Sequence, residues 1–230
     1  MNPQLLVVPI FWGWEIPPSN NSPFNVFDVL RGVIDIMDSH YFDGLASYGL
    51  AAGGAYDYGA TVPAGYKLPN PFTDQNCWDI IDRAIRENWV RPPEYYDNAG
   101  NIINKYRTVY TLFVAPGHAF TDPNIFGRNS KQYRPGAGAC WVTSNSDLAG
   151  GLGTFAHELI EAGTQAEIAD PCAKDPTFYL NGVRLPKYQV AGACWPDDKT
   201  ILQWLMDEML SHSRYAHPVR NLSNLKLFSR

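Results

Sequence analysis

The residues best suited to chemistry lie in the segment GTFAHELIEAGT, residues 153–164. His157 and Glu161 are four positions apart, so on a helix they lie on one face, one turn apart. An imidazole and a carboxylate at that spacing can bind one divalent ion. Glu158 follows the histidine directly, and in HExxH proteases a glutamate at this place takes a proton from metal-bound water. The HExxE pattern therefore predicts His157 and Glu161 as metal ligands and Glu158 as the catalytic base.

The rest of the ligand set must come from elsewhere in the chain, because catalytic zinc takes three protein ligands and a water. Glu167 and Asp170 follow within ten residues of Glu161, and we expect them to supply the missing ligand. His118, in the segment APGHAF, is a further candidate. We expect zinc as the cofactor, although nitrogen and oxygen ligands also suit calcium or manganese.

The surroundings of the motif separate a functional helix from a chance match. HExxE also occurs on solvated helix surfaces, where the side chains simply face water. Here the other helix positions are apolar: Leu152, Phe155, Ala156, Leu159, Ile160 and Ala162. Such a helix belongs in a core, where a carboxylate is costly unless it is paired or bound to a metal.

Hydrophobic periodicity predicts the elements that position this helix. The predicted helices cover 26–37, 74–89 (capped by Thr73 or Asp74), 151–164 and 198–211. The predicted strands cover 5–12, 106–117 and 139–144, with two short strands in 41–70 and a hairpin at 177–190 turned at Asn181–Gly182. The run at 106–117 is almost continuously apolar, so it is expected at the centre of the sheet.

The stretch containing Gly127, Pro135, Gly136 and Gly138 is expected to be a long loop. We expect one α+β domain over 1–195, with a C-terminal helix and basic tail over 196–230.

Composition excludes several classes of protein. The chain has 230 residues, a net charge of −5, 18% charged residues and 13% aromatic residues. It is too apolar for a disordered protein and lacks the basic patches of a nucleic-acid binder. No apolar run approaches the roughly 18 residues that span a membrane. Residues 1–27 contain no Lys or Arg, so 5–14 is predicted to be a strand, and we expect a signal peptide to be absent from this chain.

The four cysteines predict an extracellular location. Cys77, Cys140, Cys172 and Cys194 form no CxxC pair, which argues against a four-thiolate zinc site. An even number of cysteines in a chain with few charges is typical of an extracellular domain with up to two disulfides. Three pairings are possible, and we favour Cys172–Cys194 because these residues flank one short hairpin-like stretch. Buried free thiols in a cytosolic protein are the alternative.

Several segments resemble the exordium (phosphate-induced) proteins of plants and their bacterial and fungal relatives. They are VVPIFWGW at 7–14, YFDGLASYG at 41–49, LFVAPG at 112–117, AHELIEAGT at 156–164, EIADPC at 167–172, LNGV at 180–183 and ACW at 193–195. The resemblance implies a secreted protein with a zincin-like α+β fold, a mixed central sheet with the HExxE helix packed on it, and a metal site. One position departs from the family pattern, because Gln165 stands where the family has an aspartate.

Two functions remain open on this evidence. The first is an extracellular metal-dependent, peptidase-like hydrolase that acts on a peptide or a cell-wall or matrix substrate. The second is a non-catalytic secreted protein that self-assembles or binds wall or matrix material and keeps a structural or vestigial metal site. Gln165, the low charge and the tyrosine-rich loops favour the second function.

Overall fold

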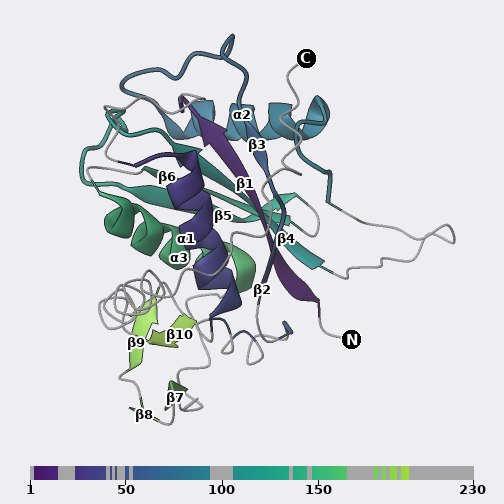
Figure 1. The fold of residues 1–230 in the computed structure, drawn as a ribbon, viewed down its shortest axis with the longest axis vertical. Coiled ribbons are helices and arrows are strands. Elements are labelled where there is room, and N and C mark those ends of the chain that lie inside the picture. The colour runs from purple at the N-terminus through teal and green to yellow at the C-terminus, as the bar shows by residue number, and fades with distance from the viewer. Residues whose placement is uncertain are drawn as a thin grey trace, which may run out of the picture.

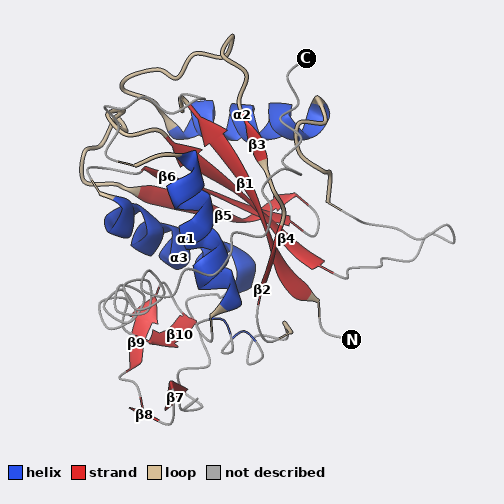
Figure 2. Ribbon diagram, in the orientation of Figure 1, coloured by secondary structure: helices blue, strands red, loops and turns tan. Residues whose placement is uncertain are grey.

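The computed structural model describes residues 3–14, 24–39, 42, 45, 50–51, 54–93, 106–134, 137–143 and 147–164, and the backbone of four short strands between 179 and 196. Helices and a mixed sheet make up this part of the chain, so the predicted α+β class is confirmed (Figure 2). None of the described helices is long and apolar enough to cross a membrane.

A six-stranded sheet forms the centre of the fold. Its strands are β1 (Gln4–Trp12), β2 (Gly54–Tyr56), β3 (Ala60–Thr61), β4 (Tyr106–Val114), β5 (Gly127–Arg134) and β6 (Ala137–Thr143). The order is β2-β1-β4-β6-β5, and β3 also pairs with β1. All pairings are parallel except that of β5 with β6, so β5 is an antiparallel edge strand. The prediction that 106–117 is central is confirmed, because β4 lies between β1 and β6.

Three helices pack on this sheet within the described residues, and local sequence signals set their starts. They are α1 (Val26–Asp38), α2 (Asp74–Arg86) and α3 (Leu148–Thr164). Asn25 caps α1 and Thr73 caps α2, and in each case a side-chain oxygen accepts from backbone N–H groups of the first turn. Of the two predicted caps of α2, Thr73 and Asp74, the structure has Thr73, and α3 begins three residues before the predicted start at 151.

The helices divide between the two faces of the sheet (Figure 1). Leu5, Val7 and Phe11 of β1 point to the core beneath α1 and α3. The alternate residues Leu6 and Val8 point to the core beneath α2. Both faces of the central strands are therefore buried, which explains why β1 and β4 read as nearly continuous apolar runs.

The segment expected to be a long loop is a strand, and this prediction was wrong. Residues 127–134, with the sequence GRNSKQYR, form β5. An edge strand borders solvent along one side and tolerates charged and polar side chains. Its composition therefore resembles that of a loop, and apolar periodicity does not reveal it.

The C-terminal part is described by short strands only. β7 (Tyr179–Leu180) and β8 (Val183–Arg184) pair antiparallel on either side of the predicted turn. A second hairpin, β9 (Lys187–Val190) with β10 (Ala193–Pro196), was not predicted. The turn at 181–182, the predicted helix 198–211 and the tail to 230 lie outside the described residues.

The prediction of disulfides is wrong for the two cysteines whose side chains are described. Cys77 and Cys140 are free thiols, both fully buried. They belong to cores on opposite faces of the sheet, so the sheet itself separates them. Burial raises the pKa of both thiols. Cys172 lies outside the described residues, and Cys194 is described by its backbone only, which leaves the favoured pairing without support.

Candidate functional site

The edge strand β5 places two residues against α3. Gly127 pairs with Val142 of β6, and Asn129 pairs with Cys140. Val142 and Cys140 both belong to the core beneath α3. Because directly opposed residues of an antiparallel pair point to the same side of a sheet, Gly127 and Asn129 face α3 as well.

Two carboxylates of α3 meet the side chain of Asn129. Glu158 and Glu161 are only 8% and 7% exposed. Asn129 Nδ2 donates hydrogen bonds to Glu158 Oε2 at 2.7 Å and to Glu161 Oε2 at 2.5 Å. The two acidic groups therefore converge on a single amide from the neighbouring strand.

His157 forms the outer side of this cluster. Its Nε2 lies 3.2 Å from Glu161 Oε1, as the four-residue spacing on one helix face predicts. The His157 side chain is 36% exposed, whereas Glu161 is buried. The cluster is thus open to solvent at the imidazole and closed at the carboxylates.

Gly127 makes room for Glu158 beside the sheet. A Cβ atom at position 127 would lie 2.8 Å from Glu158 Cγ and 2.7 Å from Thr154 Cγ2. Real Cβ contacts are essentially never that short. The absence of a side chain at Gly127 therefore lets Glu158 lie directly against β5.

A polar row lies under the cluster in the sheet. Thr111 of β4 is in register with Cys140 of β6, which is in register with Asn129. Thr111 Oγ1 and Cys140 Sγ are 3.3 Å apart, and both residues are fully buried. Asn129 is thus the outermost member of a row that starts in the middle of the sheet.

Burial dominates the electrostatics of Glu158. It raises the pKa of this carboxyl group, and the nearby charge of Glu161 acts in the same direction. The hydrogen bond from Asn129 and the charges of His157 and Arg128 oppose these effects, but the net pKa stays above the ordinary value. Glu158 is therefore easier to protonate than a solvated glutamate.

The predicted metal-binding group is corrected within the described part of the chain. No group of three or more His, Cys, Asp or Glu side chains is placed there to hold a metal ion. His157 and Glu161 supply two donors that lie together, and the carboxylate of Glu158 is turned to Asn129. Because catalytic zinc needs three protein ligands, the residues described do not fit it, and we derive no step through a metal.

The predicted sources of a third ligand, Glu167 and Asp170, lie outside the described residues, so their roles stay predictions. Gln165, the position that departs from the family pattern, lies outside them as well. His118 lies in the loop after β4, next to Ala119, whose carbonyl oxygen accepts a hydrogen bond from Phe72 N–H. It belongs to no group of three or more possible ligands among the described residues.

The sequence does not reveal Asn129 as part of this cluster, because its polar, glycine-containing segment resembles a loop. The two-residue step from Gly127 to Asn129 is the spacing of one strand face, but a single such step is not specific. The sequence analysis predicts Cys140 either as a disulfide partner or as a buried free thiol, and neither prediction places it next to Asn129. Its position behind Asn129 depends on the pairing of β5 with β6, which no local pattern indicates.

Comparisons with known proteins found no match for the chain. No family model matches it, and neither a curated protein nor a solved structure does. The resemblance to the exordium family therefore stays a prediction.

Proposed function

We propose that this chain is a peptidase-like hydrolase that works by general acid–base catalysis, with Glu158, Glu161 and His157 as its reacting groups. One observation carries the proposal: two buried carboxylates and an imidazole of α3 converge at the edge strand β5. Burying two acidic groups side by side is costly, so their presence on a core helix favours a functional role. Paired carboxylates in distinct environments are a recurring arrangement for acid–base chemistry.

The proposed reaction assigns one role to each group. Glu158 takes a proton from water as the water oxygen bonds to the carbonyl carbon, and the carbonyl π electrons move to its oxygen. The oxygen's electron pair then re-forms the carbonyl as the carbon–nitrogen bond breaks, and the bond pair leaves with the nitrogen, which takes the proton back from Glu158. His157, the exposed member, meets the substrate first and acts in its doubly protonated form: Nδ1–H donates to the carbonyl oxygen while Nε2–H donates to Glu161. Glu161 holds His157 through the 3.2 Å contact between Nε2 and Oε1.

The sheet supports a peptide-like substrate. β5 is the last strand in the order of the sheet, and no described strand pairs with its outer side. An extended peptide can add to such an edge through main-chain hydrogen bonds. Asn129 and Gly127 belong to the same strand, so an added peptide would pass close to the cluster. A zincin-like arrangement, in which the HExxE helix lies on a mixed sheet, is consistent with this geometry and is part of the proposal.

A test of the proposal is the Glu158→Gln variant, with Glu87→Gln as a matched control. Glu87 is an exposed glutamate at the end of α2, away from the cluster. We expect Glu158→Gln to lower kcat on a fluorogenic peptide library by roughly 100-fold or more, since general acid–base catalysis contributes about that much. Glu87→Gln should hydrolyse the same peptides at the wild-type rate.

Whether hydrolysis depends on a metal ion can be tested separately. Dialysis against a chelator should leave the hydrolysis rate unchanged, because the proposed chemistry uses side chains alone. A rate that falls on chelation and returns with added zinc would instead contradict the metal-free mechanism.

A second function is favoured by one observation. Asn129 satisfies both carboxylates, which is also what a purely structural polar cluster requires. The chain would then be a non-catalytic secreted protein that binds wall or matrix material or assembles with itself. Wild-type protein that cleaves no peptide, together with Glu158→Gln protein of altered stability, would support this alternative. Secretion stays a proposal with weaker support, because Cys77 and Cys140 form no disulfide.

A further inference from the structure

A single amide group connects both acidic side chains of α3 to the sheet. The two N–H bonds of Asn129 Nδ2 point to different carboxylates, at 2.7 Å to Glu158 and 2.5 Å to Glu161. The geometry points to Asn129 as the positioning residue of this site: it holds Glu158 and Glu161 convergent and fixes α3 against β5. The inference rests on the proposed function only in treating the carboxylates as reacting groups.

The backbone around Asn129 is suited to this role. The pairing of β5 with β6 is regular from Gly127 to Ser130, and the register shifts only between Ser130 and Arg134. Asn129 is opposite Cys140, which is fully buried and contacts Thr111 of the central strand β4. The position of the amide is therefore set by the interior of the sheet rather than by a loop.

The chemistry of the amide matters more than its shape. Two carboxylates that share a site repel each other when both are charged. Asn129 places a hydrogen-bond donor between them, and donors to charged acceptors form the stronger hydrogen bonds. Aspartate has nearly the same shape, but it lacks the two N–H bonds and adds a third carboxylate.

This difference gives a test that separates donation from packing. We compare Asn129→Ala and Asn129→Asp with the wild-type full chain by chemical denaturation. If Asn129 acts as a donor, the folded-to-unfolded ratio falls about tenfold or more in the Ala variant and further in the Asp variant. A packing role gives the opposite order, with the isosteric Asp variant close to wild type, and that order would overturn the inference.

A swap of donor and acceptor provides the rescue. In the double variant Asn129→Asp with Glu161→Gln, the amide of residue 161 can donate to the new carboxylate of residue 129. We expect this variant to recover at least about tenfold of the stability that Asn129→Asp loses. Effects that simply add, with no recovery, would contradict a direct contact. If Asn129→Asp alone does not fold, a double variant that does fold is equally evidence for a direct contact between residues 129 and 161. The Asn129→Ala variant still measures the stability lost with the donor.

The matched control is Ser130→Ala on the same strand. Ser130 is opposite Ala139, which belongs to the core on the other face of the sheet. The Ser130→Ala variant should unfold at the same denaturant concentration as wild type, because the side chain of residue 130 points away from the two glutamates. A loss of stability equal to that of Asn129→Ala would assign the effect to the strand and not to the amide.

Kinetics then show whether the positioning serves catalysis. If peptides are hydrolysed, Asn129→Ala should lower kcat while KM stays near the wild-type value, since the substrate does not contact the lost amide. Should wild-type protein hydrolyse no peptide, the proposed function fails, and the stability series still decides the positioning role. A folded Asn129→Ala variant with unchanged kcat would end the catalytic part of the inference.

Discussion

The edge strand β5 faces two helices and treats their acidic residues differently. Toward α2 it presents arginines: Arg128 lies 3.1 Å from Asp74, and Arg134 contacts Asp82. Toward α3 it presents Gly127 and Asn129, and the glutamates there meet an amide and an imidazole. One strand thus provides charge neutralisation on one face and neutral donation on the other.

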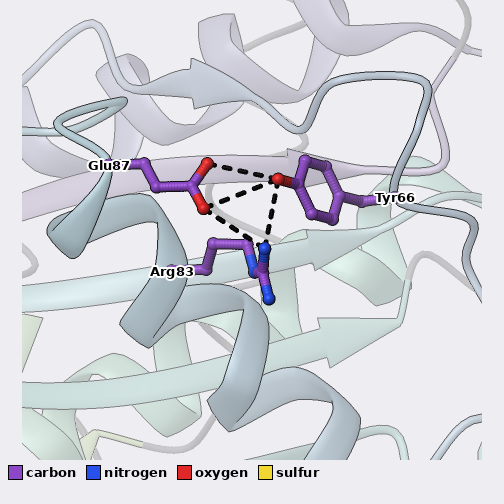
Figure 3. A network of polar contacts seen from close by, with 3 residues as sticks. All are labelled: Tyr66, Arg83 and Glu87. Atoms are coloured by element: carbon purple, nitrogen blue, oxygen red, sulfur yellow. Dashed lines mark hydrogen bonds and ion pairs between the residues drawn. The ribbon is translucent and has the colours of Figure 1, made fainter.

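The acidic side chains on the two faces differ in their exposure to water, which determines how much their contacts contribute to stability. The side chain of Asp82 is 43% exposed, so water screens its ion pair and the pair adds little stability. A second polar network, beside α2, is partly exposed: Arg83 donates to the hydroxyl of Tyr66 and contacts Glu87, and the hydroxyl donates to Glu87 (Figure 3). Glu158 and Glu161 have no comparable solvation, because both are buried. The acidic residues on the α2 side are therefore solvated ion-pair partners, whereas those on the α3 side are buried, which is why the proposed reaction is placed there.

The largest expected effect is on the α3 side of the comparison. Glu161→Gln removes the charge that holds His157 and should lower kcat by roughly 100-fold. Peptide hydrolysis measures it, alongside Asp79→Asn on the exposed surface of α2, which should not change the rate. An equal loss of kcat in Glu161→Gln and Asp79→Asn would contradict the proposal that only the acidic residues facing α3 take part in the reaction.

The second-largest effect is expected at Gly138, where α3 packs closely against the sheet. A Cβ atom at Gly138 of β6 would lie 2.7 Å from the backbone oxygen of Ala162, which cannot move as a side chain can. We expect Gly138→Ala to destabilise the protein by about 1–3 kcal/mol in urea denaturation and to lower activity by shifting α3. Gly65→Ala is the control, because nothing lies within 4 Å of that position. Unchanged stability in Gly138→Ala would show that α3 does not depend on this close approach.

A smaller effect is expected from Asp82 on the α2 side. Burial alone would raise the pKa of this carboxyl group, but hydrogen bonds from Tyr133 and Arg134 and the charges of Arg134 and Arg86 lower it overall. A lowered folded-state pKa stabilises the fold above the unfolded pKa of about 3.9, and this contribution is lost as the pH falls through the folded value. Because the group is partly exposed, Asp82→Asn should cost less than about 1 kcal/mol at pH 7. Urea denaturation at pH 7 and at pH 2 measures this, and a difference from wild type that does not shrink at low pH would contradict the assignment.

The smallest effect is expected from the exposed network in Figure 3. Arg83→Gln removes the contacts to Tyr66 and Glu87; the Arg83 and Glu87 side chains are more than a third exposed, so the melting temperature should not change measurably. Differential scanning calorimetry is the measurement. A loss larger than that of Asp82→Asn would mean that the α2 surface depends on its ion pairs after all.

Local sequence predicted much of the frame of this fold. The strand at 5–12, the central strand at 106–117 and the cap at Thr73 follow from apolar periodicity and helix-end chemistry, which need only neighbouring residues. The contact between His157 and Glu161 follows likewise from the pitch of one helix.

Tertiary structure alone decided what faces those two residues. The strand carrying Asn129 is polar because it lies at an edge, and that location depends on pairing with β6 rather than on its own composition. The separation of Cys77 from Cys140 likewise depends on which face of the sheet each occupies. Short-range spacing determined which groups of α3 meet one another. Long-range strand pairing determined that an amide, and not a third metal ligand from the described residues, lies between the two glutamates.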